Sequence, residues 1–252
     1  MAARTRLLSL FLVTMLAASC TAGSSLEPSI GEEPEPSTPE TASEPGEPTP
    51  RPCDPGFVCS GELVPGEYTS TGTGVRITFT LAGEGWSGGE DTPGDGFALF
   101  NDAAVGGRHG ISVVAYYGEV FSEVCSKEPT EMIGTEAADL IAFLAAVEGV
   151  DAGDPVDTRA GGLPAIRLDL TTVSPCNDPD VGDRMWLWTI PSGDFHFNDG
   201  EQVRVYAIDA GNVVVAIVIE AFPDVAGPDA DYDVLLQKAE EVIATMVIAP
   251  PS

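Results

Sequence analysis

The sequence predicts an α+β fold: an antiparallel β-sheet flanked by two amphipathic helices, preceded by an export signal and a disordered linker. Apolar and polar residues alternate over several segments, which indicates strands, and two other segments repeat apolar residues at helical spacing. The composition also changes sharply after residue 52. We therefore expect a lipoprotein signal peptide at 1–19, a lipidated linker at 20–52 and a single globular domain at 53–252.

The segment 1–19 has the features of an export signal. Two arginines precede an apolar run of 12 residues, Leu7 to Ala18, which is shorter than the about 20 residues of a membrane-spanning helix. The small residues before Cys20 resemble the lipobox of bacterial lipoproteins, in which this cysteine is acylated. The resemblance implies that Cys20 carries lipid and holds the protein on the outer side of the cell membrane.

Residues 21–52 predict a disordered spacer. They contain eight prolines, seven glutamates and nine serines or threonines. Such a segment cannot bury enough apolar surface to offset the entropy that ordering would cost. We expect a partly polyproline linker that holds the domain away from the membrane.

Four cysteines remain once Cys20 is lipidated, and an even number in an exported chain indicates disulfides. Cys53 and Cys59 flank a Pro-Gly turn, so we pair them with each other and pair Cys125 with Cys176. The second bridge would close a loop of about 50 residues and stabilise the domain by roughly 3 to 4 kcal/mol. A zinc site is the alternative, but no CxxC motif or nearby histidine in the sequence favours it.

The domain is strongly acidic. Residues 53–252 hold 33 Asp or Glu and 8 Lys or Arg, which gives 8 minus 33, or a net charge of −25. This charge excludes nucleic acid as a partner, because phosphate binding needs positive charge. Two explanations of the acidity stay open, a surface adapted to saline conditions and the binding of cations.

Alternation predicts five half-buried strands, at 75–81, 110–117, 163–173, 184–190 and 202–208. A sixth, 212–221, is apolar on both faces and is expected in the middle of the sheet. A tight "DAGN" turn joins it to 202–208 as an antiparallel hairpin.

Two helices are expected to pack on this sheet. The first spans 136–148, with an N-cap at Thr135 and a stop at Gly149. The second spans 232–246 and turns one apolar face inward. Strands, a helix, further strands and a closing helix make an α+β layer arrangement.

Four segments carry a family resemblance: "VRITFTLAGEGWSG" with its Gly85-Trp86 turn, "EDTPGDGFALF", "GLPAIRLDL", and "VVVAIVIEAF" before the last helix. They resemble the PsbP-like fold of actinobacterial cell-surface lipoproteins, over about residues 62–248. The resemblance implies an accessory protein, because known members mostly bind other macromolecules or modulate ion cofactors. No catalytic residue can be carried over, since the shared motifs are packing motifs.

A serine hydrolase motif is present in outline. "GWSGG" (85–89) matches G-x-S-x-G with Ser87 as nucleophile, and His196 follows downstream. A nucleophile elbow must turn from strand into helix, whereas the glycine-rich residues after Ser87 predict a loop. We expect no enzyme here, and we expect His109 and His196 to be exposed loop histidines.

Two acidic segments are weak calcium candidates. In the first, "DADYDVLLQKAE", the oxygen ligands of an EF-hand-like loop would be Asp229, Asp231, Asp233 and Glu240. Val234 stands where such a loop needs glycine, and capping of the last helix explains the aspartates equally well. In the second, a turn-rich loop after Cys176, they would be Asn177, Asp178, Asp180 and Asp183.

The aromatic pair Trp186 and Trp188 lies two residues apart on one expected strand, so both should face the same side together with Ile190. Under a helix this face would be core. If it is open, it would form a ligand platform with Phe195 and Phe197.

The sequence therefore favours a membrane-anchored extracytoplasmic lipoprotein with a non-catalytic binding or accessory role toward an envelope protein or cell-wall polymer. A calcium- or small-ligand-binding lipoprotein is the alternative, and a serine hydrolase is the remote one.

Overall fold

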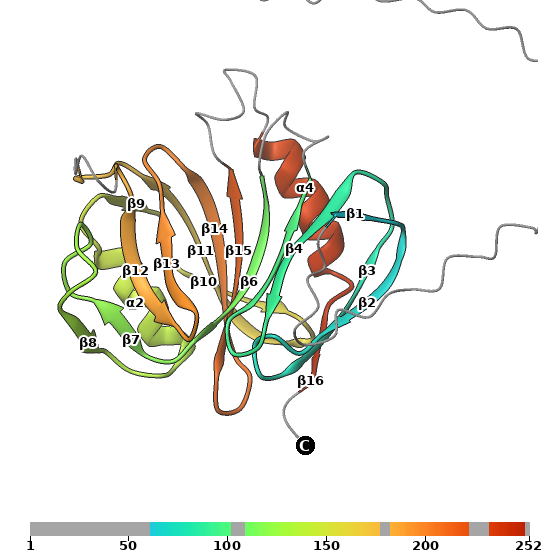
Figure 1. The fold of residues 1–252 in the computed structure, drawn as a ribbon, viewed down its shortest axis with the longest axis horizontal. Coiled ribbons are helices and arrows are strands. Elements are labelled where there is room, and N and C mark those ends of the chain that lie inside the picture. The colour runs from blue at the N-terminus through green and yellow to red at the C-terminus, as the bar shows by residue number, and fades with distance from the viewer. Residues whose placement is uncertain (1–60, 102–108, 177–181, 222–231, 250–252) are drawn as a thin grey trace, which may run out of the picture. The chain divides into compact units, whose positions relative to one another are not determined.

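The computed structural model describes residues 61–101, 109–176, 182–221 and 232–249. All of them belong to one compact unit. The described residues form an antiparallel α+β fold with two helices (Figure 1). Neither of these helices is long and apolar enough to cross a membrane.

Nine strands form the large sheet, in the order β1-β4-β5-β6-β15-β14-β11-β10, with β9 also pairing with β11. In chain order these are β1 (Gly61–Leu63), β4 (Trp86–Thr92), β5 (Gly96–Phe100), β6 (Gly110–Tyr116), β9 (Val150–Ala152), β10 (Val156–Ala160), β11 (Leu163–Thr172), β14 (Gln202–Asp209) and β15 (Val214–Ala221). Every residue of β15 is buried, between antiparallel β6 and β14. The predictions of a central strand and of its hairpin with β14 are confirmed.

Two smaller sheets and two helices complete the fold. The four-stranded sheet is ordered β13 (Gly193–Phe197), β12 (Met185–Ile190), β7 (Glu119–Phe121), β8 (Thr130–Met132), and the three-stranded sheet β16 (Val247–Ala249), β3 (Arg76–Leu81), β2 (Gly66–Ser70). The helices are α2 (Ala137–Ala146) and α4 (Tyr232–Ile243).

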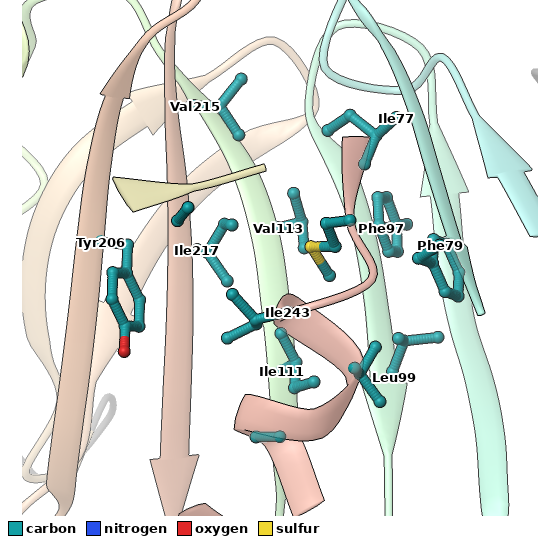
Figure 2. Close-up of a cluster of buried hydrophobic side chains, with 14 of the residues drawn as sticks. Ile77, Phe79, Phe97, Leu99, Ile111, Val113, Tyr206, Val215, Ile217 and Ile243 are labelled. Carbon is teal, nitrogen blue, oxygen red and sulfur yellow. The ribbon is translucent and has the colours of Figure 1, made fainter. Parts of the chain in front are cut away.

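One face of the large sheet packs against α4 and the three-stranded sheet. Figure 2 shows Ile243 of α4 pointing toward Ile217 and Ile111 of the sheet, all three of them buried. Phe79 of β3 stacks on Phe97 of β5 with ring centroids 5.3 Å apart. Each such side chain contributes about 1.5 to 3 kcal/mol by leaving water, so this apolar cluster fixes α4 on the sheet.

The opposite face packs against α2 and the four-stranded sheet. Trp188 of β12 is fully buried there. Its ring stacks on Phe195 at 4.3 Å and meets Tyr116 edge-on at 6.2 Å. This second core sets the position of α2 and of the residues that follow its C-terminal end.

The first turn of α2 is capped by acidic side chains. The N-cap is Glu136, so the predicted N-cap at Thr135 is wrong by one residue. The Asp139 carboxylate accepts the backbone N–H of Glu136 at 3.0 Å, and Asp209 at the end of β14 accepts that of Ala137 at 2.8 Å. Carboxylates suit this end because free N–H groups and the helix dipole make it positive.

The last helix does not close the chain as predicted. It ends at Ile243 rather than Met246, and β16 follows it and pairs with β3. Met246 is still buried, as its apolar character predicts. The backbone N–H of Thr80 donates to the Thr245 hydroxyl at 2.9 Å, which ties the connection to the sheet.

Candidate functional site

A disulfide joins Cys125 to Cys176, which lie 51 positions apart in sequence with Cα atoms separated by 5.2 Å. It is the pairing that the sequence predicts once the Pro-Gly turn assigns Cys53 and Cys59 to each other. Cys20, Cys53 and Cys59 lie outside the described residues, so lipidation and the first disulfide stay predictions.

Beside this disulfide lies a pocket of about 480 Å³, which we call the acidic pocket. It is bounded by the end of α2, by the residues after β7 and by β8. The lining residues are Phe121, Ser122, Glu123, Val124, Cys125, Glu131, Phe143, Ala146, Val147 and Glu148. Aromatic and aliphatic side chains therefore lie next to three carboxylates, a composition typical of ligand sites that bury an apolar group and orient a polar one.

Backbone hydrogen bonds and the disulfide hold the β7 side of the acidic pocket. Ser122 N–H donates to the Pro129 carbonyl at 3.0 Å. Trp186 N–H of β12 donates to the Val124 carbonyl at 2.7 Å. This wall is thus fastened to the neighbouring strand as well as to Cys176.

The turn after α2 shapes the other wall. Val147 ends the helix, and its N–H donates to the Phe143 carbonyl at 3.0 Å. Gly149 then adopts a φ of +84°, and a Cβ there would lie 2.4 Å from Cδ of Pro175. Only glycine combines this backbone conformation with so close an approach, so the predicted stop at Gly149 also brings α2 against the segment that carries Cys176.

The charge of the acidic pocket is negative and uncompensated. Its three glutamates are exposed, and none of them makes an ion pair with another described residue. The last turn of α2 contains no basic residue, so the negative end of the helix dipole adds to the field. Lys127 is the nearest cation in sequence to Glu123, but its Nζ lies 2.5 Å from Asp194 and 4.0 Å from the Trp186 ring centroid.

Of the two alternatives for Trp186 and Trp188, the open platform is wrong, the core position is confirmed for Trp188, and the expected shared face is wrong. A β-bulge shifts the β12–β13 register between the two residues, so Trp186 pairs with His196 and Trp188 with Phe195. An extra residue in one strand reverses the alternation of side chains. Trp188 therefore enters the core, while the Trp186 ring packs on the other side against His196, with centroids 5.0 Å apart. Both tryptophans are buried.

Neither histidine is the exposed loop residue that the sequence predicts. His109 is fully buried just before β6, and its carbonyl accepts the N–H of Asn101 at 2.8 Å. His196 lies within β13, half-buried. Burial lowers the pKa of His196 below its ordinary value, and the positive charge of Arg184 lowers it further.

Ser87 lies in β4, which continues to Thr92, so the loop predicted directly after Ser87 is wrong. Within β4 it pairs with Glu62 of β1 and Phe100 of β5. It does not stand on a strand-to-helix turn, and His196 belongs to a different sheet. The geometry of a nucleophile elbow is therefore not formed at this serine.

The calcium candidates fall largely outside the described residues, which contain neither Asp178 and Asp180 nor Asp229 and Asp231. In the part of the chain that is described, no group of three or more His, Cys, Asp or Glu is arranged to hold a metal ion. Glu240 has another role than calcium ligand, because its carboxylate accepts a hydrogen bond from Arg204 at 2.8 Å.

The structure contains a pair of buried glutamates that the sequence pattern does not predict. Glu220 lies at the end of β15 opposite Val203, and Glu201 lies two residues before Val203, on the same face by strand alternation. Glu201 is fully buried and Glu220 is 7% exposed. Burial raises the pKa of both carboxyl groups, and the charge of Glu220 raises that of Glu201 further.

No family model and no curated protein matches the chain. Among solved structures it is similar to the solution structure of cyanobacterial PsbP (CyanoP) from Synechocystis sp. PCC 6803, with 13% identity and a TM-score of 0.37. The similarity covers 76% of this chain and 98% of the cyanobacterial one. Membership of a lipoprotein family stays a prediction.

Proposed function

We propose that this protein is an extracytoplasmic lipoprotein, anchored in the cell membrane through Cys20, whose domain has a non-catalytic binding role toward another protein of the envelope. The observation that carries the proposal is the acidic pocket, a preformed concavity of about 480 Å³ lined by apolar side chains and three glutamates. Its position beside a disulfide favours a rigid binding site, because such a site loses little entropy when a partner binds.

The lining of the acidic pocket supports binding rather than catalysis. The lining residues include no histidine or lysine, and Cys125 is oxidised in the disulfide. The Ser122 hydroxyl donates to the Pro129 carbonyl at 2.8 Å, so its proton is bound to a carbonyl and not to a base. An activated nucleophile needs an adjacent base that is itself oriented, and no described hydrogen bond joins the Ser122 hydroxyl to one of the lining glutamates.

The anchor is tested by Cys20→Ala in the full chain. We expect the native chain to sediment with membranes and to be released only by detergent, and the variant to lose this attachment, because two acyl chains give lasting membrane binding and a chain without them has no such anchor. Fractionation of cells followed by immunoblotting measures it. Equal membrane attachment of the two chains would contradict the lipoprotein assignment.

The binding site is tested by placing a photo-cross-linking residue at Ala146 of the full-length lipoprotein in intact cells. Ala146 is exposed at the acidic pocket. Val247, 57% exposed on β16, is the matched control, because the three-stranded sheet packs on the other face of the large sheet. We expect a discrete protein adduct at position 146 that is absent at position 247.

Two results would contradict this assignment. Equal or absent labelling at the two positions would exclude the acidic pocket as the binding site. An adduct destroyed by a cell-wall hydrolase and resistant to protease would replace the protein partner with a cell-wall polymer.

A further inference from the structure

We propose that the acidic pocket takes the side chain of an arginine or lysine, flanked by apolar residues, from the partner protein. This proposal rests on the proposed function and names the chemistry that the partner must offer. Three features of the described residues carry it: the sign of the charge, the position of the helix end and the apolar side chains of the lining.

The charge favours a cation. Glu123, Glu131 and Glu148 line the same pocket without an ion-paired partner among the described residues. A guanidinium or ammonium group that enters this pocket gains charge-assisted hydrogen bonds to the carboxylates that line it. The surrounding acidic domain also draws cations toward the site over longer distances.

The end of α2 adds to this preference. Ala146 is the last residue of the helix, and Ala146, Val147 and Glu148 all line the acidic pocket. The last carbonyl groups of a helix carry partial negative charge, and here no basic side chain of the last turn neutralises them. An anionic ligand would meet both the carboxylates and this helix end, so the site rejects it.

The apolar surface explains why the cation should be an amino-acid side chain rather than a metal ion. Phe121, Phe143, Val124 and Val147 line the acidic pocket along with the glutamates. The methylene stem of arginine or lysine packs on such surface while its charged head stays at the rim. A hydrated metal ion gains nothing from these groups and prefers a cage of oxygen ligands.

The experiment uses the full lipidated chain in detergent and two blocked tripeptides, acetyl-Leu-Arg-Leu-amide and the same peptide with citrulline in place of arginine. Citrulline keeps nearly the same shape and removes the positive charge. We expect the arginine peptide to bind at least tenfold more tightly by titration calorimetry in low salt. The preference should shrink as salt is raised, because exposed charges are screened.

Two triple variants test whether the preference for the arginine peptide arises in the acidic pocket. In Glu123→Gln/Glu131→Gln/Glu148→Gln we expect the preference for arginine to be lost. The control, Glu62→Gln/Glu67→Gln/Asp157→Asn, removes the same charge from exposed positions on β1, β2 and β10 and should keep the preference. Thermal unfolding of both variants checks that they fold as the native chain does.

The outcomes separate this proposal from the proposed function. If both peptides bind equally, or if neither binds while position 146 still cross-links to a protein, the ligand class is wrong and the binding role stands. If the control variant loses the preference as fully as the pocket variant, the effect belongs to the overall charge and the ligand class is again wrong. If neither peptide binds and no adduct forms at position 146, both proposals fail.

Discussion

Replacing Cys125 and Cys176 together with alanine is expected to lower the free energy of unfolding by about 4 kcal/mol. The two residues are 51 positions apart, and cross-linking a loop of this length removes entropy from the unfolded chain by roughly that amount. The loss is large for a domain, because native stabilities are commonly about 5 to 15 kcal/mol. Chemical denaturation of the native chain and the variant, followed by the tryptophan fluorescence of the core, measures it.

The same substitution should also weaken the binding of a partner at the acidic pocket, while the packing of the core stays largely as it is. Cys125 lines the pocket, and the bridge fastens the wall after β7 to the segment that Gly149 brings against α2. A reducing agent should destabilise the native chain and affect the double variant much less. If the double variant unfolds at the same denaturant concentration as the native chain, the bridge does not constrain the unfolded state as proposed.

Regular alternation made the central strands predictable from the sequence. β3, β6, β11, β12, β14 and β15 all follow the period of two or are apolar throughout, and the hairpin turn between β14 and β15 has the residues that such turns need. Burial on one or both faces imposes those patterns, so the patterns predict the strands.

Strands without such a pattern were missed, and β4 shows why. Its glycines suggest a loop, yet a Cβ at Gly89 would lie 2.8 Å from the ring of Phe100 on β5. Glycine stands there because the neighbouring ring covers the strand, which is a tertiary cause with no local signal. The bulge in β12 is a similar case, since nothing in "MWLWTI" indicates the extra residue that separates Trp186 from Trp188.

The candidate site was only partly predictable. The Pro-Gly turn between Cys53 and Cys59 left Cys125 to pair with Cys176, but the acidic pocket unites residues 121–125, 131, 143 and 146–148, and their spacing carries no motif. The fold alone brings these segments together. Glu201 was missed for a different reason: it follows an Asn-Asp-Gly turn, and that context normally predicts a solvated side chain.

The buried glutamates Glu201 and Glu220 lead to the second prediction: in high salt, the domain should become less stable as the pH rises from about 4.5 to about 8. Both pKa values are raised in the folded protein, chiefly by burial, from an ordinary value of 4.5. The unfolded chain therefore releases these protons at lower pH than the folded one. Below 4.5 the stabilising contribution is fully present, and it is lost as the pH rises toward the folded pKa values.

The expected loss is of the order of several kcal/mol, because each unit by which a pKa is raised is worth about 1.4 kcal/mol. Denaturant titrations at a series of pH values measure it. High salt is needed because the net charge of the domain also opposes folding as carboxyl groups ionise, and salt screens that general repulsion between exposed charges more than the interaction of a buried pair.

Single substitutions separate the contribution of Glu201 and Glu220 to the pH dependence from that of the other charged residues. Glutamine resembles a protonated glutamate in shape and cannot ionise, and the Ser112 hydroxyl that donates to Glu220 at 2.6 Å can donate to it equally well. Glu201→Gln and Glu220→Gln should each flatten the pH dependence and leave the domain more stable than the native chain at pH 8. Glu62→Gln, at an exposed position on β1, should leave the slope unchanged.

The contacts around Glu201 explain why a change in packing does not remove the energetic cost of ionising this buried carboxyl group. The Glu201 N–H donates to the Thr172 hydroxyl at 2.8 Å, and the Thr172 N–H donates to the Glu201 carbonyl at 3.0 Å. The backbone is thereby held on both sides, and Oε2 of Glu201 has no hydrogen-bond partner among the described residues. The Asn198 side-chain amide donates to the other oxygen, Oε1, and the buried carboxyl group lowers its energy by keeping its proton. An equal slope in the native chain and the two glutamine variants would show that the pair is hydrated or apart in solution.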